Sequence, residues 1–246
     1  MPVRLPPVVA TFDDAQRHAI SMLADVFARL ESGMLRRDIE ELAETRMGDH
    51  GFSTWYHRPE VAIGQAIAKQ GLLRLPNAGK ALAMGDLVSI DIGPATSESY
   101  GDIGATRLFG ATDEPMVLAR ARDAIRGACG YASRWKTCGE IYVFSKAFAS
   151  NHRLQLVNES AIGHRLLTRE GMFARGFPRS AHLATLMPRN RLHKLNPVRM
   201  DGMFAIRPVL ADGPWAASFE EVLYIHEDTR VVLGRDSMAD IGTLPS

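Results

Sequence analysis

Apolar and polar residues alternate with two different periods along this chain. Apolar residues recur at helical spacing in four segments, and alternating or continuous apolar runs typical of strands lie between and after them. We predict helices over 11–30, 35–47, 115–133 and 139–150, and strands over 61–67, 88–92, 102–109, 204–210, 222–226 and 230–233. Helices followed by strands, twice over, favour an α+β protein in which the helices cover one continuous sheet.

Two aspartates lie in the predicted hairpin over 88–109. Asp91 alternates with apolar residues in the first strand, a Gly/Pro/Ser-rich turn covers 93–99, and Asp102 begins the second strand. Such a hairpin brings the two carboxylates side by side. Carboxylates that close repel each other unless a cation or a proton lies between them, so the pair indicates a hard-metal site or an acid/base pair. The alternative is two aspartates that merely flank turns, where this residue is common.

Three short motifs follow the aspartates in a fixed order: Gly163-His164, the run from Gly202 to Pro208 and the run from Ser218 to Leu223. With the aspartates, they resemble the pita-bread metallohydrolase family of methionine aminopeptidase, creatinase and prolidase, over about residues 11–233. The resemblance implies a pita-bread α+β fold, in which two pseudo-symmetric halves form a curved antiparallel sheet covered by helices. It also implies a single domain over 1–246, without the amino-terminal domain of creatinase and prolidase.

The family holds two divalent ions with ligands in the order Asp, Asp, His, Glu, Glu. By resemblance, the matching residues are Asp91, Asp102, His164 and, at the last position, Glu221. The fourth ligand is missing, because the family's Gly-Met-x-Phe-x-Ile-Glu-Pro is one residue shorter here and Arg207 stands at the place of its Glu. A guanidinium cannot coordinate a metal and brings a permanent positive charge. We therefore expect no metal cofactor, with Arg207 as the counter-ion of the carboxylates.

Two alternatives to a metal-free site stay open. In one, a single ion (manganese, cobalt or zinc) is retained by Asp91, Asp102 and Glu221, with His164 as a further ligand. In the other, the fourth ligand lies elsewhere in the chain.

The histidines and arginines give further candidates. The family's second histidine follows its ligand histidine by about seven residues, and none does so after His164. Either an insertion separates His164 from a catalytic His182, or Arg175 takes the place of the ligand histidine; a structural histidine is the alternative for His182. His57 resembles the His-Pro segment ahead of the site in prolidase-like members. We expect His57, Arg175 and Arg179 to bind substrate. The alternatives are a surface-loop histidine for His57 and a solvated surface for the arginine-rich region 164–200.

Composition limits the compartment and the partners. A net charge of +1 gives no general attraction to nucleic acid or to an anionic membrane. No apolar run approaches the roughly 18 residues that span a bilayer, and the proline-rich start is unlike a signal peptide. The two cysteines, Cys129 and Cys138, form no disulfide framework or zinc motif. We expect a cytoplasmic protein that binds a small molecule or a short peptide, with a homodimer as an open alternative.

Three functions follow as hypotheses. The first is a metal-independent enzyme on this fold, which uses Asp91, Asp102, Glu221, His164, His182 and Arg207 on a small amino-acid- or peptide-derived substrate. The second is an aminopeptidase or amidohydrolase that keeps a single ion. The third is a non-catalytic protein that binds peptides or proteins. We favour the first, because a pure binding protein has no reason to keep buried carboxylates together at a cost of several kcal/mol.

Overall fold

The computed structural model describes residues 4–69, 79–168 and 177–245. Its five α-helices in this range are α1 (Pro7–Ala28), α2 (Arg36–Arg46), α3 (Met116–Tyr131), α4 (Cys138–Asn151) and α5 (Arg179–Thr185). Thr137 caps α4, since its hydroxyl accepts from the Glu140 amide while the Glu140 carboxylate accepts from the Thr137 amide. None of the described helices is both long and apolar enough to cross a membrane.

The strands form three antiparallel sheets. One has the order β1-β2-β3, with β1 (Thr54–Ile63), β2 (Leu87–Ala95) and β3 (Ile103–Leu108). The second has the order β10-β9-β6-β5, with β5 (Gly163–Leu166), β6 (Gly202–Ile206), β9 (Glu221–His226) and β10 (Thr229–Val232). The third has the order β4-β7-β8, with β4 (Gln155–Leu156), β7 (Val209–Asp212) and β8 (Trp215–Ser218). A β-bridge between Ala105 and Phe219 joins the two halves of the chain.

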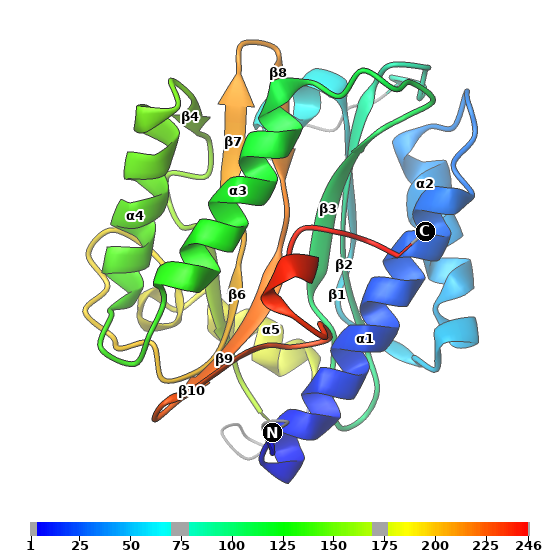
Figure 1. The fold of residues 1–246 in the computed structure, drawn as a ribbon. Helices are drawn as coiled ribbons and strands as arrows, with labels where there is room; N and C mark the ends of the chain where they lie inside the picture. The colour runs from blue at the N-terminus through cyan, green and yellow to red at the C-terminus, as the bar shows by residue number, and fades with distance from the viewer. Residues whose placement is uncertain (1–3, 70–78, 169–176, 246) are drawn as a thin grey trace.

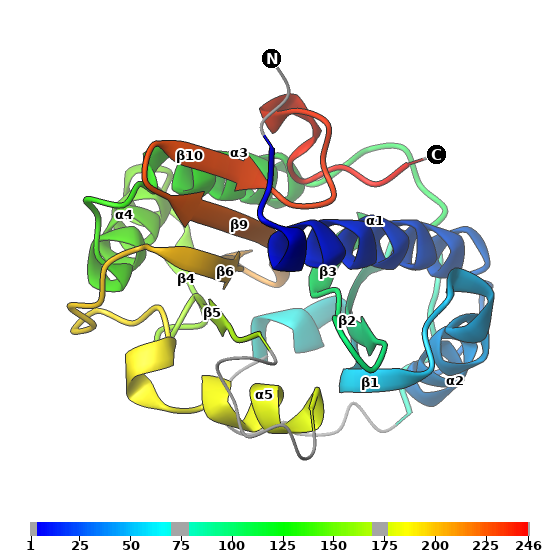
Figure 2. The ribbon, with the colours of Figure 1, turned by 90° about the horizontal axis from the view of Figure 1, so that it is seen from below.

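Helices lie on both sides of the layer that these three sheets form. Helix α1 packs against β2 and β3, and α3 packs against β7 and β8 on the same side. Helix α5 lies on the opposite side against β1 and β5 (Figure 2). Every position of β2 is therefore buried (Figure 1). Because side chains of a strand alternate between its faces, Val88, Ile90 and Ile92 enter the core and Asp91 faces the side of α5.

The predicted fold class is confirmed, and several predicted boundaries are wrong. The first strand lies earlier than predicted, at Thr54–Ile63, because the chain from Gly64 to Lys69 turns into a 3₁₀ helix. The predicted strand over 204–210 is two strands, β6 and β7, since Arg207 and Pro208 interrupt it. The first helix starts at Pro7, whose missing amide and fixed φ suit a first helical turn. Strands β4, β5 and β8 and helix α5 were not predicted.

Candidate active site

A polar cavity of about 280 Å³ lies between the two halves of the sheet and α5. Strand β1 contributes two titratable side chains to it, and β2, β5 and α5 contribute one each. The loops at Asp102, Arg191, Arg207 and Glu220 contribute four more. Its lining is His57, Glu60, Asp91, Asp102, Asn158, Ala161, Gly163, His164, His182, Thr185, Leu186, Arg191, Arg207 and Glu220.

The β2–β3 hairpin brings Asp91 and Asp102 together. Asp91 pairs with Gly104 in the strand register, and both aspartates are buried. Their Oδ1 atoms lie 3.5 Å and 3.1 Å from the same atom, Nε2 of His57. The Asp102 backbone is fixed from α1, because Gln16 accepts from its amide at 2.8 Å and donates to its carbonyl at 2.9 Å. The two aspartates that the sequence places in one hairpin therefore line the same cavity.

Of the two adjacent glutamates before β9, Glu220 lines the cavity and Glu221 does not, so the prediction for Glu221 was wrong in its placement. Glu221 is fully buried on the other side of the strand, where Arg235 donates to its two oxygens at 2.7 and 3.0 Å and the Gly242 amide donates at 2.7 Å. Neighbouring strand residues face opposite sides, so only one of the two glutamates can reach the cavity. Glu221 instead fixes the carboxy-terminal segment to the core.

Arg207 reaches the carboxylates from the junction of β6 and β7. Its Nη1 donates to Asp91 Oδ2, and its Nε donates to Ser218 Oγ at 3.2 Å. The backbone of Arg207 is held on both sides, since its amide donates to the Ile162 carbonyl at 2.6 Å and Asn158 Nδ2 donates to its carbonyl at 2.6 Å. The negative charges of Asp91, Glu220 and Asp102 raise the pKa of Arg207 against the effect of burial, so the guanidinium is charged.

Three histidines share the cavity. His164 Nε2 lies 3.3 Å from Asp102 Oδ2, and the His182 ring centroid lies 5.6 Å from that of His57. His164 therefore occupies the carboxylate side of the cavity, and Arg175 lies outside the described residues. Arg179, at the first position of α5, is exposed and outside the cavity lining, so its predicted place at the site was wrong.

Burial and neighbouring charges give these groups different protonation states. Burial would lower the pKa of His57, but Asp91 and Asp102 outweigh it and raise that pKa to about 9. Burial and the charge of His57 lower the pKa of His182 to about 4, and burial lowers the pKa of His164. Burial, with Asp102 and Asp91 nearby, raises the pKa of Glu220 well above its usual value. The cavity thus combines a carboxyl group that keeps its proton to a higher pH than usual with two imidazoles, His164 and His182, that lose theirs at a lower pH than usual.

Several members of this site could not be found by motif. Glu220 differs from Glu221 only in strand parity, and Asn158, Glu60, Thr185 and Arg191 carry no motif. The position of Ser89 beside the site could have been predicted, because it lies two residues before Asp91 and so on the same face of β2. In the structure its hydroxyl lies 3.5 Å from Arg207 Nη2.

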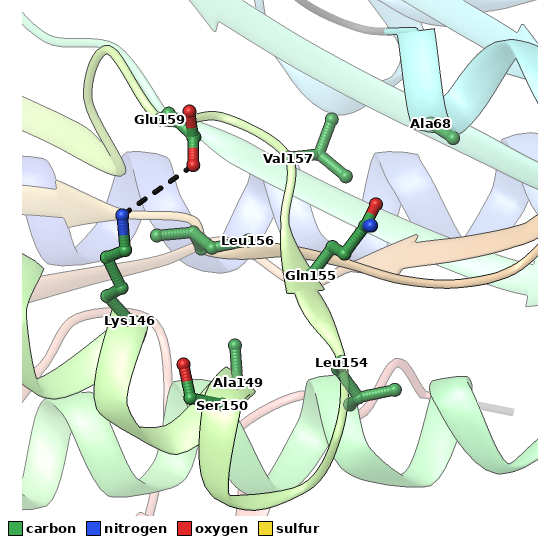
Figure 3. Close-up of a pocket in the computed structure, with 9 residues that line it drawn as sticks. All are labelled: Ala68, Lys146, Ala149, Ser150, Leu154, Gln155, Leu156, Val157 and Glu159. Atoms are coloured by element: carbon green, nitrogen blue, oxygen red, sulfur yellow. Dashed lines mark ion pairs between the residues drawn. The ribbon is translucent and has the colours of Figure 1, made fainter.

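A second hollow of about 500 Å³ lies between α4 and β4 (Figure 3). Lys146 and Glu159 form an ion pair of 3.7 Å across its edge, and both side chains are largely exposed. The rest of its described lining is uncharged: Ala68, Ala149, Ser150, Leu154, Gln155, Leu156 and Val157. The chemistry of the described residues therefore concentrates in the first cavity.

The family assignment agrees with this geometry. The model of metallopeptidase family M24 matches residues 10–227. The chain belongs to this family. None of the curated proteins compared with the chain matches it.

Solved structures show the same fold for this M24 protein. X-Pro aminopeptidase from Thermotoga maritima has a TM-score of 0.72 and 18% identity, over 96% of this chain and 63% of its own. Prolidase from Pyrococcus furiosus has a TM-score of 0.72 and 17% identity, over 96% of this chain and 66% of its own. Methionine aminopeptidase from Thermotoga maritima has a TM-score of 0.71 and 17% identity, over 96% of this chain and 100% of its own. The chain thus spans about two thirds of the first two relatives.

A guanidinium lies among the side chains of this M24 protein that could hold metal. Asp91 is paired with the guanidinium of Arg207. At about 4 Å and an effective dielectric near 20, a dication beside that guanidinium costs roughly 8 kcal/mol of repulsion. By donor type, two groups of described residues could each hold an ion, and the ligand atoms of each group lie within 4.8 Å of one another: His57, Asp91 and Asp102, and Asp102, His164 and Glu220.

Proposed function

We propose that this M24 protein is an enzyme that acts on a small amino-acid- or peptide-derived substrate in the cavity, without a dinuclear metal centre. The observation that carries the proposal is the Arg207 guanidinium on Asp91, inside a group of buried carboxylates. Burying such charges costs several kcal/mol, and a protein without chemistry at this place would gain stability by replacing them with apolar residues.

Unpaired polar atoms support a polar substrate. Among the described cavity residues, five buried side-chain atoms make no hydrogen bond: Asp91 Oδ1, Asp102 Oδ2, His164 Nδ1, His182 Nδ1 and Glu220 Oε2. An unmade hydrogen bond at a buried polar atom costs about 1–3 kcal/mol, so a cluster of five favours a ligand that donates and accepts hydrogen bonds. The amino and carbonyl groups of an amino-acid derivative have this chemistry.

The charge states suggest which groups move protons. Glu220, whose pKa burial raises, is placed to donate a proton to a leaving or carbonyl group. The neutral imidazoles of His164 and His182 are placed to accept one. Proton transfer by a positioned side chain contributes about 10²- to 10⁴-fold to a rate.

The test is turnover of a substrate panel with and without chelator. The panel contains Xaa-Pro dipeptides, peptides with amino-terminal methionine and amino-acid amides. We expect chelator-resistant turnover of at least one class, which Glu220→Gln lowers about 100-fold or more. Glu159→Gln is the control, since the Glu159 side chain is largely exposed and lies outside the lining of this cavity. No turnover by folded protein on any class would refute the proposal.

The second candidate is a hydrolase with one divalent ion, which the grouping of Asp102, His164 and Glu220 favours. In that case these three side chains would hold the ion, and the ion would polarise a substrate carbonyl. Turnover that chelator abolishes and one equivalent of manganese restores would decide for this candidate. Metal analysis of the same samples by mass spectrometry would give the stoichiometry.

A further inference from the structure

Helix α5 and the residue after it expose three large apolar side chains beside the cavity, on the outside of the molecule (Figure 2). Leu183 is 63% exposed, Leu186 is 61% exposed and Met187 is 57% exposed. Single exposed apolar residues are normal on a protein surface, but a contiguous group at the edge of a polar cavity indicates a binding surface. We call these three residues the apolar shelf.

The periodicity of α5 makes the apolar shelf continuous with the cavity. Ala181, on the face of α5 that packs against the sheet, is fully buried. His182 and Leu186, four residues apart and therefore neighbours on the helix surface, both line the cavity. Leu183 and Met187, again four apart, follow on the side of Leu186 away from the sheet. Leu186 therefore belongs to the cavity and to the shelf.

Hydrogen bonds fix the backbone that carries the apolar shelf. The amide of Met187 donates to the Ala184 carbonyl at 3.2 Å, and Nδ2 of the buried Asn190 donates to the same carbonyl at 2.8 Å. Thr185 Oγ1 donates to the His182 carbonyl at 2.7 Å. The three apolar side chains are therefore held at the mouth of the cavity by backbone that is anchored on the side of the sheet.

The cavity and the apolar shelf differ in polarity. The buried cavity atoms without a hydrogen bond belong to Asp91, Asp102, His164, His182 and Glu220. The shelf offers hydrocarbon and a thioether, and neither Leu183 nor Met187 is part of the cavity lining. A ligand that fits both surfaces has a polar head group that exchanges hydrogen bonds in the cavity, and an apolar chain that extends out of it.

We propose that the substrate of this cavity is an amphiphilic amino-acid derivative, whose apolar chain leaves the cavity across Leu186 onto Leu183 and Met187. The inference rests on the proposed function for the place of the polar head group. A methylene removed fully from water strengthens binding by about fourfold, so one that the shelf covers on a single side adds about twofold. A chain that reaches across the shelf should therefore bind more tightly than a short one.

The test measures by calorimetry how alanine derivatives of graded chain length bind. One series contains the ethyl, butyl and hexyl amides of alanine, and the other contains acetyl-, butanoyl- and hexanoyl-alanine. The two series show from which end of the amino acid the chain leaves the cavity. We expect the affinity of the wild type to rise about tenfold or more from the shortest to the longest member of one series.

A triple variant with Leu183→Ser, Leu186→Ser and Met187→Ser should lose most of this rise, because the chain then lies over hydroxyl groups. All three side chains are exposed, so the variant should fold like the wild type. Leu195→Ser is the control and should keep the rise, since Leu195 is 80% exposed and lies outside the cavity lining. Equal affinities along both series in the wild type, or a rise that the triple variant keeps, would overturn the inference.

A second copy of the chain is the other occupant that the apolar shelf could have. Sedimentation of the wild type and of the triple variant at the concentrations used for calorimetry tests it. We expect the same state of association for both proteins. A wild-type dimer that the triple variant separates into monomers would show that the shelf is a contact between copies, and would overturn the inference.

These readouts separate the inference from the proposed function. A protein whose affinity rises with chain length, but which turns over no substrate class, would retain the inference and refute the proposed function. A protein that turns over a substrate class without chelator-sensitive metal, but binds short and long chains equally, would do the reverse.

Discussion

Arg207→Ala should destabilise the protein strongly, because it removes the guanidinium that pairs with the buried carboxylate of Asp91. The Arg207 side chain is 13% exposed and that of Asp91 is 9% exposed, so water can replace the lost guanidinium only in part. Removing one partner of a buried ion pair costs about 3–5 kcal/mol. In a chain of this size each kcal/mol shifts Tm by roughly 2–4 °C, so we expect a loss of about 10 °C.

The assay is urea and thermal unfolding of Arg207→Ala and of a matched surface variant. The control is Arg122→Ala, since Arg122 also donates to a carboxylate, that of Glu114, but the two side chains are 26% and 46% exposed. Exposed pairs contribute about 0–1 kcal/mol, so the control should stay near the wild type. If Arg207→Ala loses no more stability than Arg122→Ala, the guanidinium does not balance buried charge and the reasoning fails.

Three further predictions concern the surroundings of the aspartates. Glu221→Gln should lower the free energy of unfolding in urea by about 3 kcal/mol or more, because it leaves Arg235 without its ionised partner. Glu220→Gln should keep that free energy within about 1 kcal/mol of the wild type. Gln16→Met should cost about 2 kcal/mol, because it leaves the buried amide and carbonyl of Asp102 without partners, as urea unfolding would show. A folded-state pKa of about 9 for His57, above the ordinary 6.5, gives stability that is complete below pH 6.5 and is lost as the pH rises to 9. Between pH 6.5 and 9 the wild type should lose about 3 kcal/mol of its free energy of unfolding, and a His57→Asn variant should not show this loss.

The hairpin could be predicted because its information is local. Alternation through β2 places Asp91 on the face opposite Val88, Ile90 and Ile92, and the short turn returns the chain to Asp102. The interruption of the predicted strand at Arg207 was harder to predict from the sequence. Pro208 has no amide for a ladder hydrogen bond, so the strand must end there and the Arg207 side chain turns into the cavity.

The choice between Glu220 and Glu221 could not be made from the sequence. Two adjacent glutamates before an apolar run fit the strand pattern equally well in either register. The structure decides it through Arg235 and Gly242, which belong to the segment after β10 and hold Glu221 on the core side. No local pattern indicates that an arginine beyond the next hairpin will pair with this carboxylate.

His57 shows why a ligand search by resemblance was incomplete. Such a search compares residues at the positions where metal ligands occur, and it gave His57 only a place in a segment that resembles the family's His-Pro segment. The structure adds its contacts, since His57 comes from β1, lies within 3.5 Å of both aspartates and fits because Gly93 lies opposite it across the strand pair. Two buried carboxylates with one guanidinium leave one negative charge that a further cation or a proton must offset, so the neighbours of Asp91 and Asp102 matter as well as the ligand positions. The cavity therefore has to be read as a set of charges that must balance, in addition to a set of ligand positions.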